Sequence, residues 1–124
     1  MRTAAARRQE ILDAIAQSAA IAKRNAADVE LVAVSKGRTV AEIEPLIAAG
    51  QRDFGENRVQ EALDKWPALL ATNPGIRLHA IGRLQSNKAA ETVKLFDVIH
   101  SLDRRSLLDA LVKEVAEADR FPAI

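Results

Sequence analysis

Lys36 is the side chain of this sequence whose type and position best suit covalent chemistry. It stands where the apolar run from Leu31 to Val34 ends, and Gly37 follows directly. Period-two alternation in a strand places Lys36 on the same face as Val32 and Val34. A lysine amine held among apolar groups can attack a carbonyl carbon and form a Schiff base. The alternative, which position alone favours, is a loop lysine that extends into solvent.

Other polar groups follow the later strands of the pattern. They are Gly55-Glu56-Asn57, the loop "GRLQSNK" at 82–88, and Ser101-Leu102-Asp103. Ligands of α/β proteins meet the carboxyl ends of the strands, so these segments are candidates for a site. A glycine-led loop that enters a helix can receive an anion on its N–H groups. Because "GRLQSNK" lacks both the G-x-G-x-x-G and the Walker spacing, a capped turn is the favoured interpretation.

Two histidines and three acids complete the set of reactive side chains. His79 and His100 lie on expected strands, where a hydrogen-bonded interior histidine is the simplest interpretation. The chain has no cysteine and no H-x-H or H-E-x-x-H spacing, so we predict no metal site. Asp53, Glu56 and Asp103 have the chemistry of acids or bases. Asp53 is better explained as a strand-entry residue, and Asp103 as a helix cap.

The composition describes one small domain. The chain has 124 residues, 48% of them hydrophobic, and a net charge of +1. This near-neutral balance argues against nucleic acid or an anionic membrane surface as a partner. No apolar stretch approaches the ~20 residues that cross a bilayer. Glu10 and Asp13 stand where a signal peptide needs an apolar core, so we expect a cytoplasmic protein.

Strand and helix patterns alternate four times after a leading helix. Apolar spacing predicts the leading helix at 3–24 and a continuous apolar strand at 29–35. The later elements are a helix from Thr39 to Gly50, a strand at 52–57, a helix from about Arg58, a strand at 76–82, a helix to about Leu95, a strand at 96–102 and a helix from Asp103. This alternation is typical of an α/β protein with a parallel sheet. Residues 120–124 have the pattern of a fifth strand that is just beginning.

Local signals set several boundaries of these helices. Thr39 and Glu42 have the spacing of a capping box. Ser86 or Asn87 is expected to cap the helix that ends near residue 95. Pro67 predicts an interruption of the helix that begins near residue 58, because proline lacks the N–H that the helix interior needs.

Four ordered motifs are far more specific together than any one of them. "AVSKGR", "FGENRVQEA", "HAIGRLQSNK" and "FDVIHSLDR" occur in this order and at this spacing. Together they closely resemble the pyridoxal phosphate homeostasis protein family, over essentially the whole chain from about residue 3. The resemblance implies a single α/β barrel of the TIM type, similar to the N-terminal domain of alanine racemase. It also implies a protein that binds pyridoxal 5'-phosphate without a defined catalytic turnover.

The resemblance changes the interpretation of Lys36. In the family, the lysine that closes the first strand in "AVSK" holds pyridoxal phosphate as an internal aldimine, and Lys36 occupies that position. The resemblance further implies that residues of the other motifs line the pocket around the cofactor ring: Asn57, His79, Gln85, Ser86, Asn87 and Ser101. The chain departs from the family at Arg58, where tyrosine is common, and at Ala80, where an aromatic residue is common. Both departures concern the packing of the ring.

The length of the chain bears on its architecture. An eight-unit barrel needs roughly 250 residues, or about 200 at the low end. The chain carries a leading helix and four units, so residues 1–124 are expected to be the N-terminal half of one barrel domain. The family's second half, which holds the cofactor phosphate, is then absent. We expect the full-length form to be a monomer and the isolated half to associate with itself through its unpaired strand edges.

Two other functions stay open at this point. A racemase or lyase acting on amino acids could use the same lysine and cofactor, and turnover would distinguish it. A small open-sheet interaction module would suit the length. That module would carry an acidic pair at the end of its first strand, where this chain has Ser35 and Lys36.

Overall fold

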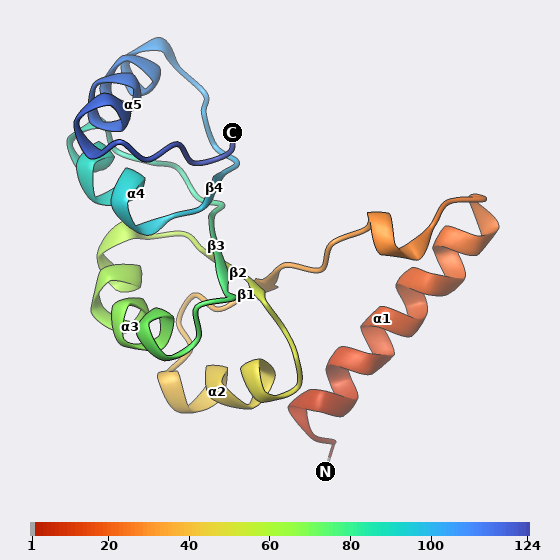
Figure 1. Cartoon of the computed structure of the whole chain (residues 1–124). Coiled ribbons are helices and arrows are strands. Elements are labelled where there is room, and N and C mark those ends of the chain that lie inside the picture. The colour runs from red at the N-terminus through yellow and green to blue at the C-terminus, as the bar shows by residue number, and fades with distance from the viewer. Residues whose placement is uncertain (1) are drawn as a thin grey trace.

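Four short parallel strands form one sheet, in the order β1-β2-β3-β4 (Figure 1). The structure is a computed structural model, and it describes residues 2–124. The strands are β1 (Ala33–Val34), β2 (Asp53–Glu56), β3 (Arg77–Ala80) and β4 (Val98–Ile99). Strands that lie side by side in sequence order are the arrangement predicted for successive β-α units. A doubly wound module would instead reorder its strands, so that alternative does not describe this fold.

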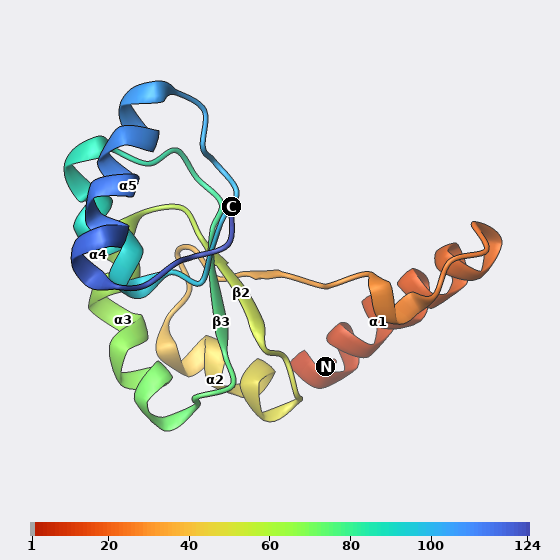
Figure 2. The same cartoon turned by 45° about the horizontal axis from the view of Figure 1, so that its top comes forward.

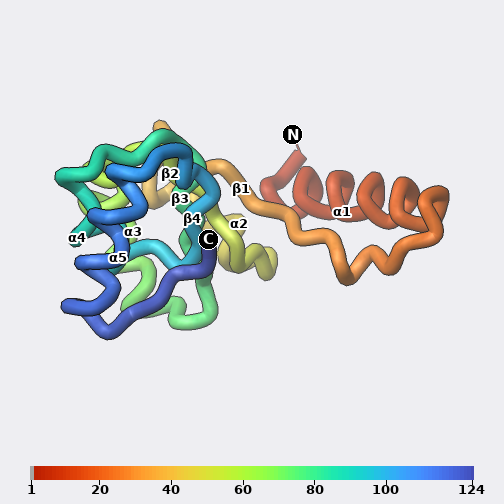
Figure 3. Tube along the Cα trace, turned by 90° about the horizontal axis from the view of Figure 1, so that it is seen from above, coloured from red at the N-terminus to blue at the C-terminus, as the bar shows by residue number. Residues whose placement is uncertain are grey.

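Four helices cover one face of the sheet and leave the other face open (Figures 1 and 3). They are α2 (Val40–Ala48), α3 (Val59–Thr72), α4 (Ala89–Leu95) and α5 (Arg105–Ala118). Because side chains alternate between the two faces of a strand, Phe54 and Leu78 point into the helix layer. There they join Trp66 and Leu107 in a core whose members are almost completely buried. The predicted α/β class is confirmed.

The leading helix α1 (Ala4–Ile21) does not pack on the strands of the sheet, although such packing would be expected of a helix that leads into a barrel. It contacts α2 near its N-terminal end and then extends away from the sheet (Figures 2 and 3). One anchor is Arg8, whose Nε donates a hydrogen bond to Oε1 of Gln51 at 2.9 Å. Ile11 and Ile21 remain 49% and 85% exposed. With so few apolar contacts, packing against the sheet does not fix this helix.

The two outer strands are shorter than the sequence predicts. Only Ala33 and Val34 of the expected strand 29–35 pair with β2, where they lie opposite Phe54 and Gly55. The 3-10 turn η1 (Ala26–Asp28) precedes this pairing. Within residues 2–124, β1 has a partner on one side only, and the far side of β4 meets only a single bridge at Ala123. Both strands therefore lack the full second ladder that extends β2 and β3.

Helix α3 passes through Pro67 without a break, so the predicted interruption is wrong. Pro67 is exposed, whereas Trp66 and Leu69 are buried beside it. A proline in a helix interior costs about 3 kcal/mol. Burying a large side chain contributes about 1.5–3 kcal/mol, so two buried neighbours offset that cost and hold the helix together.

The capping box at the start of α2 is confirmed. The N–H of Glu42 donates to Oγ1 of Thr39 at 3.2 Å, and the N–H of Thr39 donates to Oε1 of Glu42 at 3.0 Å. The hydrogen bond from the Thr39 backbone, followed by one from Arg38, holds the pKa of the Glu42 carboxyl below its usual value of 4.5. The glycine that ends this helix also behaves as predicted: Gly50 follows α2 with φ of +103°.

The other predicted caps are wrong. Ser86 and Asn87 belong to the 3-10 turn η2 (Ser86–Lys88), and no side-chain cap bond precedes α4. The carbonyl of Ser86 instead accepts the N–H of Ala89 inside the turn. Asp103 lies one residue too early to cap α5, which begins after Arg104. Its Oδ1 accepts a hydrogen bond from Nη1 of Arg104 at 2.7 Å.

A short parallel bridge beyond β4 confirms the beginning of a fifth strand. Ala123 lies opposite Val98, on the side of β4 away from β3. The N–H of Ile99 donates to the carbonyl of Ala123 at 2.8 Å, and the N–H of Ala123 donates to the carbonyl of Asp97 at 3.0 Å. The sheet order therefore continues in sequence order beyond β4.

Candidate functional site

Lys36 lies on an exposed turn at the carboxyl end of β1, the position that the sequence predicts. Ser35 before it is buried, and Gly37 after it has φ of +70°, a conformation that glycine adopts without strain. The chain therefore leaves the sheet at Lys36. Among residues 2–124, the Lys36 ammonium group takes part in none of the hydrogen bonds or ion pairs.

Helix α3 holds this turn in place. Nζ of Lys65 donates hydrogen bonds to the carbonyls of Ser35 at 2.7 Å and of Arg38 at 3.0 Å. The N–H of Gly37 donates to Oε2 of Glu61 at 2.7 Å. The backbone on both sides of the exposed lysine is thus fixed from the next helix, while the lysine side chain itself is left unbound.

A buried carboxylate lies beneath the turn. Oε2 of Glu56 accepts hydrogen bonds from Oγ of Ser35 at 2.5 Å and Nε1 of Trp66 at 2.9 Å, and it lies 3.0 Å from Nζ of Lys65. Glu56 is completely buried, and its Oε1 has no hydrogen-bond partner in the described part of the chain. It faces the helix layer, so it supports the turn and is not an acid or base beside Lys36. Sequence reasoning missed this role; the available signal was a charged residue inside an apolar strand.

An open hollow of about 590 Å³ adjoins the turn. Its lining consists of Lys36 and Gly37 from the β1 turn with Asn57, Arg58 and Glu61 from the start of α3. The structure therefore brings two of the predicted site residues, Lys36 and Asn57, to the same hollow.

The carboxyl ends of β2, β3 and β4 approach one another closely. A Cβ added at Gly82 would lie 2.7 Å from the carbonyl oxygen of Asn57, so no larger residue fits there without a backbone shift. Oγ of Ser101 donates a hydrogen bond to the carbonyl of Gly82 at 2.6 Å. Ser101, a predicted site residue, thus fixes the loop against which Asn57 packs.

A chain of hydrogen bonds crosses the open face of the sheet. Nε2 of His79 lies 2.8 Å from Oδ1 of Asp53, and Nδ1 of His79 lies 2.9 Å from Nε2 of His100. His79 is buried, whereas His100 is exposed. His79 is therefore an interior hydrogen-bonded histidine, and Asp53 is its partner as well as the first residue of β2.

The remaining predicted residues lie further along the same edge. Gln85 and Asn57 line a second hollow of about 330 Å³ between the loop after β3 and the start of α3. Ser86 and Asn87 form the turn η2, and neither of them lines this hollow or the one beside Lys36. The structure thus gathers Lys36, Asn57 and Gln85 along one edge and leaves Ser86 and Asn87 outside both hollows.

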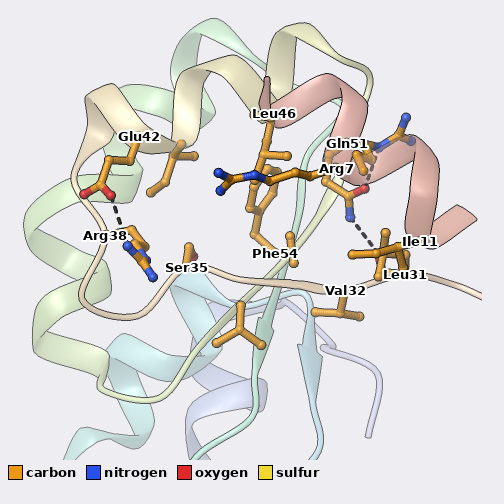
Figure 4. Close-up of a pocket in the computed structure, with 15 residues that line it drawn as sticks. Arg7, Ile11, Leu31, Val32, Ser35, Arg38, Glu42, Leu46, Gln51 and Phe54 are labelled. Atoms are coloured by element: carbon orange, nitrogen blue, oxygen red, sulfur yellow. Dashed lines mark hydrogen bonds and ion pairs between the residues drawn. The ribbon is translucent and has the colours of Figure 1, made fainter. Parts of the chain in front are cut away.

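Another hollow, of about 440 Å³, lies between α1, α2 and β1 (Figure 4). Leu46 and Phe54 contribute apolar surface, and Arg7 extends across it from α1. It contains none of the predicted site residues.

Two other kinds of feature are absent from the part of the chain that the structure describes. Among residues 2–124, no helix is both long and apolar enough to cross a membrane. The same residues contain no group of three or more histidine, aspartate or glutamate side chains placed to hold a metal ion.

Curated relatives match most of this chain. A protein of Synechocystis, named pyridoxal phosphate homeostasis protein, is 48% identical over 94 residues, which cover 76% of this chain and 43% of the relative. Proteins with the same name from Pseudomonas aeruginosa and Escherichia coli are 43% and 41% identical and cover 81% and 77% of the chain. No family model matches the chain. The chain spans little more than two fifths of the length of these curated relatives, 41–43%.

Solved structures agree with these matches. PipY of Synechococcus elongatus, with pyridoxal phosphate bound, has a TM-score of 0.74 and 45% identity; the match covers 87% of this chain and 51% of PipY. The crystal structure of an unknown protein from Bifidobacterium adolescentis has a TM-score of 0.82 and 32% identity, and the match covers 90% of this chain and 49% of that protein. The resemblance predicted from the four sequence motifs is confirmed.

Proposed function

We propose that this chain, a relative of the pyridoxal phosphate homeostasis proteins, is the lysine-bearing half of a cytoplasmic protein that binds pyridoxal phosphate. The observation that carries the proposal is the Lys36 amine. It has no partner within residues 2–124, and it stands on a rigid turn beside an open hollow at the carboxyl edge of the sheet. The names of the relatives and the cofactor in PipY support the same ligand.

The residues at this edge fit the cofactor. When bound, pyridoxal phosphate supplies an aldehyde, with which a free lysine amine can form a covalent bond. The Lys36 amine is free for this bond because Glu61 and Glu56 are already engaged by Lys65. Asn57 offers an amide that both donates and accepts hydrogen bonds in the same hollow.

The other predicted residues have roles that follow from their positions. Ser101 holds the Gly82 loop against Asn57, and so it positions that amide. Gln85 lines the second hollow together with Asn57. His79, which is hydrogen-bonded to Asp53 and His100 on the open face, would form part of the interior wall of the barrel. Contacts of Ser86 and Asn87 with the cofactor stay a prediction from the motif.

A barrel is the architecture that these features favour. The strands are parallel, follow sequence order and are covered on one face only, as in the first four units of a TIM-type barrel. We infer that residues 1–124 correspond to the N-terminal half of one such domain. In a complete barrel of this type, further units continue the sheet from the fifth strand and enclose the open face.

A carrier without catalytic turnover is the activity that the site favours. Among the described residues that line the Lys36 hollow, the single carboxylate belongs to Glu61. It already accepts the N–H of Gly37 and lies 3.4 Å from Nζ of Lys65. A racemase or lyase needs a second group that is free to move a proton at the substrate carbon, and this half offers none beside Lys36.

Covalent trapping tests the proposal. The chain is incubated with pyridoxal phosphate, reduced with borohydride and mapped by peptide mass spectrometry, and we expect the adduct on Lys36. The Lys36→Ala variant should lose the adduct, whereas Lys94→Ala, which removes an exposed lysine of α4, should keep it. An adduct on Lys65 or Lys88 with Lys36 unmodified would contradict the assignment. Racemisation of added amino acids by the loaded protein would contradict the carrier.

A further inference from the structure

Glu61 contacts another element of the fold instead of capping its own helix. It is the third residue of α3, the place that Glu42 holds in α2. Glu42 turns back and closes a capping box with Thr39. The residue before α3 is Arg58, and arginine has no acceptor for such a box. The carboxylate of Glu61 turns instead toward the loop after β1, where it accepts the N–H of Gly37 at 2.7 Å.

The loop that Glu61 contacts is a type II β-turn. The N–H of Arg38 donates to the carbonyl of Ser35 at 3.1 Å, so Lys36 and Gly37 are the two central residues. Gly37 has φ of +70° and Lys36 has a negative φ, the combination that defines type II. A Cβ added at Gly37 would meet no atom within 4 Å, so the backbone conformation, rather than lack of space, requires the glycine.

Helix α3 holds both peptide planes that flank Lys36. Lys65 binds the carbonyl of the plane before it, at Ser35, and Glu61 binds the N–H of the plane after it, at Gly37. Because peptide units are planar, the orientations of these two planes fix φ and ψ of Lys36 and hence the direction of its Cα–Cβ bond. In a type I turn the central peptide is roughly reversed, and its carbonyl oxygen would face the carboxylate of Glu61. Repulsion between these oxygens disfavours the type I turn.

We propose that Glu61 is a positioning residue for Lys36, because it holds the central peptide of the turn so that the amine projects into the hollow that both residues line. The inference rests on the proposed function. In that reaction the neutral amine attacks the aldehyde carbon, a C=N bond replaces the C=O bond and one water leaves. An amine that is already oriented loses less freedom on reaching the aldehyde carbon. Glu61 acts through the backbone and moves no proton.

Hydrogen exchange at the Gly37 amide tests the contact without any ligand. We expect this amide to exchange slowly in the unaltered chain. The side chain of Glu61 is 32% exposed, so its bond competes with water. Glu61→Ala should therefore speed exchange at Gly37 by roughly threefold to tenfold. Glu61→Gln should keep most of the protection, because its amide oxygen can accept the same N–H. Unchanged exchange in Glu61→Ala would overturn the proposal.

The rate of covalent trapping tests the consequence for Lys36. The chain is incubated with pyridoxal phosphate, samples are reduced with borohydride at intervals, and the modified fraction of Lys36 is measured by peptide mass spectrometry. Glu61→Ala should slow modification by roughly threefold to tenfold, and Glu61→Gln should restore most of the lost rate. Gly37→Ala leaves Glu61 in place but disfavours the turn through the backbone alone, and it should slow the same reaction.

A matched variant separates the held peptide from general charge. Asp64→Ala removes a carboxylate from an exposed site of α3 and should leave the rate at Lys36 unchanged. Equal slowing by Asp64→Ala and Glu61→Ala would overturn the proposal. Equal slowing by the two Glu61 variants would also overturn it, because charge rather than the held peptide would then set the rate. Failure of Lys36 to react in the unaltered chain would instead contradict the proposed function, and the positioning role with it.

Discussion

At the scale of single residues, Glu56 organises the lysine-bearing turn although it does not touch the proposed ligand. One oxygen of its buried carboxylate accepts hydrogen bonds from Ser35 and Trp66 and forms an ion pair with Lys65. Lys65 in turn donates hydrogen bonds to two backbone carbonyls of the turn. A carboxylate that is excluded from solvent stays ionised only when a counter-charge pairs with it, because an isolated buried charge costs several kcal/mol. The order of the turn therefore depends on this pair.

Removing the cation should expose that dependence. Lys65→Met leaves the Glu56 carboxylate buried without its counter-charge, and we expect a loss of about 3–5 kcal/mol in the free energy of unfolding. Urea unfolding followed by Trp66 fluorescence measures it. Lys94→Met, on an exposed site of α4, should change stability by less than about 0.5 kcal/mol. The double variant Glu56→Gln/Lys65→Met should recover part of the loss; equal stability of the two Lys→Met variants would show that the pair is not required.

The sequence could predict part of this site. The position of Lys36 at the end of β1 was predictable because a buried apolar run and a glycine bracket it. Its role toward the cofactor comes from the resemblance and stays a prediction. The contacts of Glu56 were not predictable, because its partners Lys65 and Trp66 come from a helix whose rotation about its axis is set by the core.

At the scale of elements, local chemistry decided some boundaries and tertiary packing decided others. The α2 capping box formed because its two hydrogen bonds join residues three apart. Pro67, by contrast, lies inside an unbroken α3 because the buried neighbours Trp66 and Leu69 outweigh its cost. The outer strands β1 and β4 are short because their pairing depends on neighbouring strands, which no local pattern reveals.

The capping box should make α2 sensitive to acid. The pKa of Glu42 is lowered in the folded chain, chiefly by the Thr39 backbone, so its contribution to stability is complete above the unfolded value of 4.5. That contribution is lost as the pH falls through the lowered folded pKa. We expect the NMR titration midpoint of the Glu42 carboxyl below 4.5. Glu42→Gln should remove this part of the acid dependence, and a midpoint at or above 4.5 would contradict the box.

At the scale of the whole molecule, the sheet has one covered face and one open face. Val34, on β1, remains 52% exposed. No strand among residues 2–124 lies beyond β1, so its outer backbone groups are unpaired in the sheet. Such an edge is a template for pairing with another chain. In an eight-stranded barrel, the first strand pairs with the eighth strand along this edge.

The isolated chain should therefore associate with itself. We expect the mass from light scattering to rise with protein concentration. Val34→Lys should lower that association, because a charged side chain on an edge strand disfavours pairing with another strand. Val112→Lys adds the same charge on α5, at a site 61% exposed, and should leave association unchanged. A mass that stays monomeric at every concentration would contradict the prediction.

The bridge between Val98 and Ala123 sets a limit on how large such an assembly grows. The chain's own residues already occupy the outer side of β4 at this point, so the two borders of the sheet are unequal. Copies that join through their β1 borders use the same border on each partner, which makes a two-fold contact. A two-fold contact closes on itself and leaves no free β1 border for a third copy. The asymmetry thus favours a finite pair over a filament.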